Sequence, residues 1–201
     1  MSKEKNNFEN SIKREEKVFF NQYWDSYRKI LFDSRNDLKF VEIKNIFKKI
    51  SKNGGKIIFV GNGASASLAS HAATDLTKQG KIRSIALNDH NLITALSNDY
   101  GYERWVEKAL SYYGSEKDML VLISVSGESP NLINALNYAK SKSIKTLSLT
   151  GSSKKNTLNT STNYSLWVDS KSYNIVESIH TIWITLIIDL IIGKSQYSVN
   201  K

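Results

Sequence analysis

The sequence predicts an α/β fold in which a parallel sheet is covered by helices on both faces. Two observations support this prediction. Short runs that are apolar on both faces alternate with helical stretches after residue 55, as expected for strands buried between two layers of helices. Two helical segments come before them and predict an N-terminal helical hairpin. We therefore expect one domain over 1–201, with the hairpin in 1–53 and the α/β core in 54–195.

The hairpin is predicted from the spacing of apolar side chains. They recur at helical intervals over 7–32 and again over 36–52, and Asn53-Gly54-Gly55 then forms a stop signal. These helices carry more aromatic surface than a hairpin alone can bury, which favours contacts between subunits.

The sheet is predicted from five short runs and is followed by a final helix. That helix is expected over 174–192; it is apolar almost all round, which indicates burial on several sides, including contacts between subunits. Its apolar run 182–192 is shorter than the roughly 20 residues that span a bilayer, so we expect no membrane segment. The five runs are 56–60, 83–87, 119–125, 144–149 and 164–168.

Composition narrows the class of function. The chain has no cysteine, which excludes disulfides, thiolate metal sites and a cysteine nucleophile. The net charge is +9, but the basic residues are scattered and form no dense block, which argues against a nucleic-acid interface and still favours anionic small substrates. The charged N-terminus lacks the apolar core of a signal peptide, so we expect a cytoplasmic protein.

Two loops of similar chemistry follow predicted strands. GNGASAS occupies 61–67 and SVSGES occupies 124–129, so both should lie at the carboxyl edge of the sheet, where ligands bind in this fold class. Each combines glycine with hydroxyl side chains and leads into a helix whose first N–H groups attract an anion. Neither has the lysine of a nucleotide P-loop. The pair predicts an anion site.

Pro130, the one proline of the chain, marks the start of the helix after the second loop. Ser129 is expected at the N-cap and Pro130 at the first helical position, where the missing N–H costs nothing. A well-capped helix start would explain this pattern without any ligand. Ser124, Ser126 and Ser129 are nevertheless more hydroxyls than a cap needs, and they can converge on one phosphate group.

These motifs, together with NDHNLITALSNDYGYE and the TLSLTG strand, resemble the sugar isomerase (SIS) domain, and within it the phosphoheptose isomerase family. The resemblance covers about residues 35–195. It implies a homotetramer, a zinc-assisted aldose–ketose interconversion of sedoheptulose 7-phosphate with D-glycero-D-manno-heptose 7-phosphate, and a role in lipopolysaccharide biosynthesis.

The resemblance also implies the residues that contact substrate. Ala64 stands where the family usually has glycine and Val125 where it often has threonine, and neither change matters if backbone N–H groups make the contact. The implied residues are Asn62, Gly63, Ala64, Ser65, Asn98, Asp99, Ser124, Val125, Ser126 and Ser129.

Aldose–ketose isomerisation requires a base, an acid and a group that stabilises the enediolate. His71 and Asp75 lie four residues apart on one helix face, a spacing that suits a shared metal but is also common for a surface pair. The resemblance makes them zinc ligands, with Asp75 in place of the family's glutamate. His90 is expected to be a loop residue with a capping or solvated role.

The last helix departs from the family. The positions of its glutamine and histidine ligands are occupied by Val176 and Ile184. Glu177 and His180 lie on the same helix, and His180 shares a face with both vacated positions. We therefore expect Asp75, Glu177 and His180 to be catalytic and His71, Asp75 and His180 to bind the metal; the alternative is that His180 is an ordinary buried histidine.

Three functions remain open from the sequence. The first is a phosphosugar isomerase acting on sedoheptulose 7-phosphate or a related sugar. The second is a non-catalytic SIS module, similar to the protein that associates with the bacterial replication initiator. The third is another SIS activity, such as a phosphosugar lyase or an amino-sugar isomerase.

Overall fold

The structure is a computed structural model that describes residues 12–196. The chain divides into two compact units, Met1–Ser34 and Arg35–Lys201. In the first unit, helix α2 (Arg14–Leu31) confirms most of the first predicted helix, while residues 7–11 lie outside the described part. All residues of α2 are exposed or half-buried. The hairpin arrangement stays a prediction.

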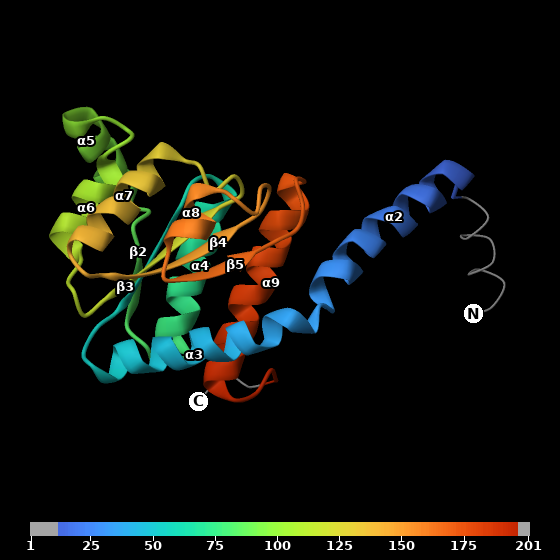
Figure 1. Cartoon of the computed structure of the whole chain (residues 1–201), viewed down its shortest axis with the longest axis horizontal. Helices are drawn as coiled ribbons and strands as arrows, with labels where there is room; N and C mark the ends of the chain where they lie inside the picture. The colour runs from blue at the N-terminus through green and yellow to red at the C-terminus, as the bar shows by residue number, and fades with distance from the viewer. Residues whose placement is uncertain (1–11, 197–201) are drawn as a thin grey trace. The chain divides into compact units, whose positions relative to one another are not determined.

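The second unit contains the predicted sheet, and each strand lies within one residue or so of its predicted run. All neighbouring strands are parallel, in the order β2-β1-β3-β4-β5 (Figure 1). The strands are β1 (Ile57–Gly61), β2 (Ser84–Ala86), β3 (Met119–Ser124), β4 (Lys145–Thr150) and β5 (Tyr164–Trp167).

Helices cover both faces of this sheet, as predicted (Figure 1). One layer is formed by α3 (Asp37–Lys52), α4 (Ala64–Lys78) and α9 (Tyr173–Ile192). The other layer is formed by α5 (His90–Tyr100), α6 (Trp105–Tyr113), α7 (Pro130–Ser141) and the short α8 (Thr157–Ser161). A 3-10 turn, η1 (Ser34–Asn36), precedes α3.

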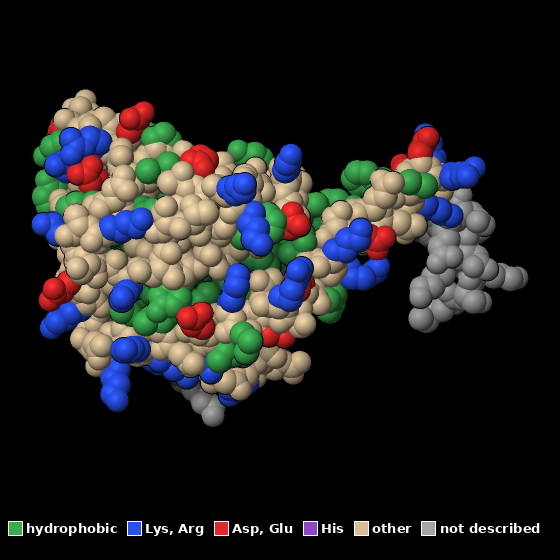
Figure 2. Space-filling view, viewed as in Figure 1, with side chains coloured by type: hydrophobic (Ala, Val, Ile, Leu, Met, Phe, Trp, Pro, Cys, Tyr) green, Lys and Arg blue, Asp and Glu red, His purple; other side chains and the backbone are tan. Residues whose placement is uncertain are grey.

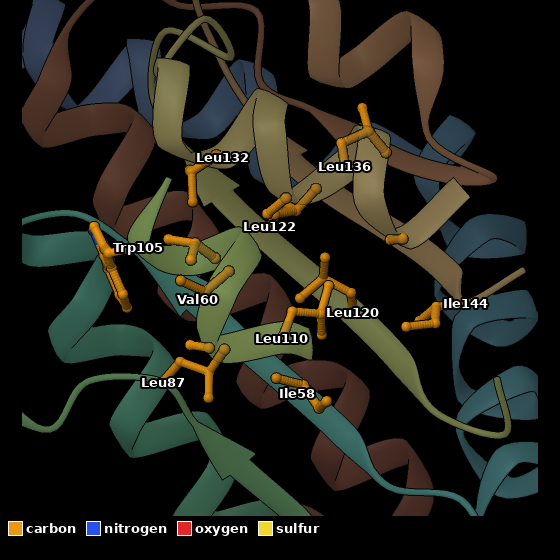
Figure 3. Close-up of a cluster of buried hydrophobic side chains, with 14 of the residues drawn as sticks. Ile58, Val60, Leu87, Trp105, Leu110, Leu120, Leu122, Leu132, Leu136 and Ile144 are labelled. Carbon is orange, nitrogen blue, oxygen red and sulfur yellow. The ribbon is translucent and has the colours of Figure 1, made fainter. Parts of the chain in front are cut away.

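Apolar side chains from alternate strand positions form a core on each face. On one face, Ile58 and Leu122 pack in a buried cluster with Trp105 of α6 and Leu132 of α7 (Figure 3). On the other face, Phe59 meets Phe47 of α3 edge-on, with ring centroids 6.4 Å apart. Burial of each such side chain contributes roughly 1.5–3 kcal/mol to the stability of the fold. The core therefore fixes the positions of α6 and α7 against the sheet.

Helix α9 is the apolar helix predicted at the C-terminal end. Its length and mean hydropathy of 1.9 would allow it to cross a membrane, but half of it is buried within the fold. It contacts α3, α4 and β4. These contacts make α9 a core helix of the α/β unit, which agrees with the prediction of a buried helix.

The strand order determines where a ligand can bind. β1 lies between β2 and β3, and the helices that follow β1 and β3 pack on opposite faces of the sheet (Figure 1). Such a reversal opens a crevice at the carboxyl ends of the two strands. The two loops singled out in the sequence, after Gly61 and after Ser124, therefore lie side by side.

Basic side chains are scattered over the visible face of the α/β unit and form no single block there (Figure 2). This agrees with the scattered charge pattern of the sequence.

Candidate functional site

The three serines of the second loop converge, as the sequence predicted. The Ser124 hydroxyl oxygen lies 3.4 Å from that of Ser126 and 3.3 Å from that of Ser129. Ser124 also accepts a hydrogen bond from the backbone N–H of Gly127 at 3.1 Å. The loop thus gathers three hydroxyl groups at the start of α7, where backbone N–H groups favour an anion.

Ser129 occupies the N-cap of α7 and Pro130 follows it, as predicted, but the cap has a different form. Among the described residues the Ser129 hydroxyl caps no backbone N–H of α7; it faces Ser124 instead. Only the Ser129 carbonyl continues the helix pattern, accepting from Leu132 and Ile133. A simple capped helix start therefore does not explain this serine, because its hydroxyl belongs to the serine cluster.

Glu128 braces the same loop from outside. Its two carboxylate oxygens accept hydrogen bonds from the backbone N–H and the hydroxyl of Thr157, both at 2.7 Å. Gly127, with φ +69°, lies so close to Asn156 that an added Cβ would be 2.0 Å from its side-chain oxygen. The second loop is therefore fixed to the start of α8, and the Glu128 carboxylate is directed toward Thr157.

The first loop is held by close packing and by an amide pair. An added Cβ at Gly61 would lie 2.7 Å from Ser65 backbone, so the start of α4 can approach β1 only with glycine here. Asn62 and Asn131 exchange side-chain hydrogen bonds of 3.1 and 2.9 Å. Tyr102 donates its hydroxyl to Asn62 at 3.2 Å. Asn62 thus joins the first loop to the start of α7.

A small cavity lies between α4 and α9. Its volume is about 160 Å³, and Ser65 and Glu177 lie on its wall together with His180. Ala64, Leu68, Ser178 and Thr181 complete the lining. The structure therefore brings together four of the residues expected from the sequence, Ala64 and Ser65 from the first loop and Glu177 and His180 from the last helix.

His180 is buried, and its ring nitrogen Nε2 lies 3.2 Å from the carbonyl oxygen of Thr150 at the end of β4. Burial lowers its pKa to about 4, although the hydrogen bond to Thr150 raises it slightly. The imidazole is therefore neutral at pH 7. Because Thr150 pairs in register with Ser124, this contact places His180 at the same sheet edge as the serine loop.

Glu177 differs from His180 in its access to solvent. Its carboxylate side chain is half-buried and lies on the cavity wall, whereas the ring of His180 is 0% exposed. The structure therefore favours Glu177 as the group that reaches a ligand and His180 as the group that holds α9 against β4. Both the catalytic and the ordinary buried role were expected from the sequence, and burial favours the second for His180.

His71 and Asp75 form a hydrogen-bonded pair on α4. His71 Nε2 lies 2.9 Å from an oxygen of Asp75, and the other Asp75 oxygen accepts from Gln79 at 3.1 Å. The His71 side chain is 61% exposed. Both residues are absent from the cavity wall that holds His180, so Asp75 is not brought to Glu177 there.

The zinc ion that the resemblance implies does not fit the ligands supplied by one chain. Val176 and Ile184 are apolar and fully buried, and His180 is engaged with Thr150. Within residues 12–196, no three His, Cys, Asp or Glu side chains lie together in a way that could hold a metal. The expected set of His71, Asp75 and His180 is thus not assembled in the described part of one chain.

The remaining expected residues lie outside this cluster. Asn98 and Asp99 are exposed near the end of α5, where Asn98 donates to Asp99 at 3.0 Å. Val125 is buried, and its carbonyl accepts from Gly151 at 3.0 Å. Gly63 is the N-cap residue of α4. His90 is the first residue of α5 and not a loop residue as expected.

Four residues of the site were not expected from the sequence: Asn131, Tyr102, Glu128 and Thr157. Asn62 lies in the first loop and Asn131 comes just after the SGESP motif, so an asparagine near each loop was a visible signal. Tyr102 follows SNDYG in the sequence, but its contact with Asn62 spans 40 residues. A contact between residues this far apart in the sequence leaves no signal in the local sequence pattern.

Similar folds are known among solved structures. A phosphoheptose isomerase from Francisella tularensis is 26% identical, with a TM-score of 0.80, and the match covers 91% of this chain and 100% of that one. A phosphoheptose isomerase from Neisseria gonorrhoeae is 28% identical, with a TM-score of 0.78 and coverage of 87% and 96%. The parallel sheet and its helical layers are therefore those of this structural group.

Curated relatives match over a shorter range. The phosphoheptose isomerases of Aliarcobacter butzleri and of Helicobacter pylori (strain HPAG1) are each 44% identical over 106 residues, which is 50% of this chain. The match spans about half the length of these relatives, 56% and 55% respectively. The family model of the SIS domain matches residues 22–151, well over half of the chain. The chain therefore belongs to the SIS domain family.

Proposed function

We propose that the chain is a phosphosugar isomerase that interconverts sedoheptulose 7-phosphate and D-glycero-D-manno-heptose 7-phosphate. One observation supports this most directly. The converging hydroxyls of Ser124, Ser126 and Ser129 lie at the same sheet edge as a cavity walled by the Glu177 carboxylate. An anion site and a carboxylate at the same sheet edge are what a phosphorylated sugar needs for proton transfer, and relatives named phosphoheptose isomerase support the choice of sugar.

The phosphate would bind first and position the sugar. The serine hydroxyls donate hydrogen bonds to the phosphate oxygens, and the positive end of the α7 dipole stabilises the phosphate charge. Glu128 keeps the loop in place through Thr157, and its own carboxylate is occupied there. The overall positive charge of the chain favours the approach of an anionic substrate.

Glu177 is the proposed base. Its carboxylate removes the proton from the carbon next to the carbonyl, and the carbonyl oxygen becomes the oxyanion of an enediolate. Ser65, on the facing wall, donates a hydrogen bond to that oxygen. Glu177 then returns the proton to the neighbouring carbon, while the hydroxyl proton passes between the two adjacent oxygens. His180 acts as a positioning residue that fixes α9 through Thr150.

Turnover and binding by matched variants test this proposal. Glu177→Gln keeps the size of the side chain but cannot accept the proton, so kcat should fall at least about 100-fold while KM changes little. Ser124→Ala should raise KM about tenfold, because the central hydroxyl of the cluster is lost. Glu116→Gln and Ser111→Ala, both exposed and outside the site, are the controls.

Asp75→Asn tests the expected catalytic role of Asp75. Because Asp75 lies outside the wall that holds Glu177, we expect less than a threefold change in kcat. A wild-type protein that turns over no phosphosugar on a broad panel would contradict the isomerase.

A second function is favoured by one observation. Val176 and Ile184 replace two ligands of the family, and a chain that has lost catalytic groups can keep the phosphate loops as a binding module. Such a protein would bind phosphosugars, and Ser124→Ala would weaken that binding, but it would show no turnover. Retention of a specific protein partner would then support the scaffold.

The proposal includes assembly and location. Helix α2 displays exposed Phe19 and Trp24, and α9 displays exposed Ile182 and Leu186, which supports a homo-oligomer, with a tetramer as the expected state. We further propose a cytoplasmic enzyme of lipopolysaccharide biosynthesis. Light scattering that shows a stable monomer would contradict the assembly.

A further inference from the structure

The side-chain amide of Asn62 is held in one orientation by two neighbours. Its oxygen accepts hydrogen bonds from Asn131 Nδ2 at 2.9 Å and from the Tyr102 hydroxyl at 3.2 Å. Its Nδ2 donates to Asn131 Oδ1 at 3.1 Å. A carbonyl oxygen has two lone pairs and an amide nitrogen has two protons. The oxygen of Asn62 is therefore saturated, while one of its N–H groups has no acceptor among the described residues.

Tyr102 offers the complementary group. Its hydroxyl gives its proton to Asn62, so the phenol oxygen keeps its capacity to accept a hydrogen bond. The side chain is 55% exposed and therefore reachable by a ligand. Asn62 is half-buried at the end of β1. A free donor on Asn62 and a free acceptor on Tyr102 thus lie next to each other where the first loop meets the start of α7.

We propose that Tyr102 and Asn62 form a subsite for one hydroxyl of the sugar, and that Asn131 is the positioning residue that orients it. The sugar hydroxyl accepts a hydrogen bond from Asn62 Nδ2 and donates its own proton to the Tyr102 oxygen. This inference rests on the proposed function, because it assigns recognition of the sugar to residues separate from the serine loop that receives the phosphate.

The subsite is built on rigid supports. Asn131 is 2% exposed, and its neighbour Leu132 is fully buried in the core of α6 and α7 (Figure 3). The ring of Tyr102 packs beside Trp105, which is 1% exposed in the same core, with ring centroids 6.5 Å apart. Both partners of Asn62 are therefore held by the packing beneath them, as a specific recognition site requires.

Binding titrations of Tyr102→Phe test the subsite. The variant keeps the ring beside Trp105 and removes only the hydroxyl. Its Kd for sedoheptulose 7-phosphate should rise about fivefold, the effect of one or two lost hydrogen bonds, while its Kd for inorganic phosphate stays the same. Tyr100→Phe is the matched control, because the hydroxyl that it loses lies near Tyr112 and not near Asn62.

A double-mutant cycle tests whether the two residues act through Asn62. Tyr102→Phe and Asn131→Ala should each weaken sugar-phosphate binding in the wild type and have little further effect in Asn62→Ala. Asn134→Ala, one turn further along α7, is the control for Asn131→Ala, since it loses a hydrogen bond to the Glu103 carbonyl only. If Asn131→Ala does not fold, the test rests on comparing the effect of Tyr102→Phe on sugar-phosphate binding in the wild type with its effect in Asn62→Ala.

The outcomes separate this inference from the proposed function. A wild-type protein that binds no phosphosugar on the panel overturns both. A wild-type protein that binds sedoheptulose 7-phosphate, with Tyr102→Phe binding it equally well, overturns the subsite alone. Equal losses for the sugar phosphate and for inorganic phosphate also overturn it, because they would show a general effect on loop structure.

Discussion

The ring of His180, on the buried side of α9, lies 3.2 Å from the carbonyl oxygen of Thr150 and is 0% exposed. This contact joins the last helix to the end of β4. It also keeps a titratable group in an environment that disfavours its charged form, and burial lowers the pKa of His180 to about 4. His180 thus contributes to the packing of α9 against β4, and its protonation is linked to folding.

Acid should destabilise the protein through His180. Its ordinary pKa of 6.5 applies to the unfolded chain, so between pH 6.5 and about 4 the unfolded state binds the proton and the folded state does not. The stabilising effect of the neutral ring is complete above pH 6.5 and is lost as pH falls through this window. The expected loss between pH 7 and 4 is roughly 3 kcal/mol in the free energy of unfolding.

Urea unfolding at each pH measures this loss. His180→Gln cannot titrate, so its stability should fall less than that of the wild type over the same range, by the stated amount. His90→Gln removes an exposed histidine and should follow the wild type. Parallel curves for His180→Gln and the wild type would show that His180 titrates normally in the folded state.

Removal of metal should leave the proposed isomerase active. The described residues of one chain place no third His, Cys, Asp or Glu side chain with His71 and Asp75, and Val176 and Ile184 cannot coordinate. After treatment with a chelator, kcat/KM should stay within about twofold, and His71→Ala should behave in the same way. Metal content is measured in parallel by elemental analysis. Stoichiometric zinc whose loss abolishes turnover would show that ligands from a second subunit complete a site.

The fold was predictable from the sequence because the central strands β1 and β3 are apolar on both faces. MLVLIS over β3 is fully buried, and its pattern alone marks a central strand. The final helix was predictable for the same reason. A fully buried strand is apolar at nearly every position, so the sequence shows where the strand begins and ends without knowledge of the strands beside it.

The site was predictable only in part, because its details depend on pairs that are distant in the sequence. The convergence of Ser124 and Ser129 was predicted because the two residues share one short loop. The missing side-chain cap of Ser129 was not predicted, because the hydrogen-bond partner of its hydroxyl depends on how the loop folds. Asn62 and Asn131 are 69 residues apart, and their pairing follows from the order of β1 and β3 in the sheet.

Glu128→Ala should weaken phosphate binding, although the substitution removes a negative charge, because the hydrogen bonds between Glu128 and Thr157 are lost. Electrostatics alone predicts that Glu128→Ala would bind an anion more tightly, but the carboxylate is exposed and its repulsion is screened by water and salt. The same change removes both hydrogen bonds that tie the serine loop to Thr157. Hydrogen bonds to a charged group outweigh a screened repulsion, so Kd for inorganic phosphate should rise about threefold to tenfold.

A double-mutant cycle with Thr157→Val shows whether the brace is the cause. Thr157→Val removes the hydroxyl and keeps the backbone N–H, so it should produce a smaller loss, and Glu128→Ala should add less in that background than in the wild type. Glu116→Ala, which removes an exposed carboxylate before β3, controls for net charge. If Glu128→Ala binds phosphate more tightly than the wild type, the charge dominates and the loop keeps its shape without the brace.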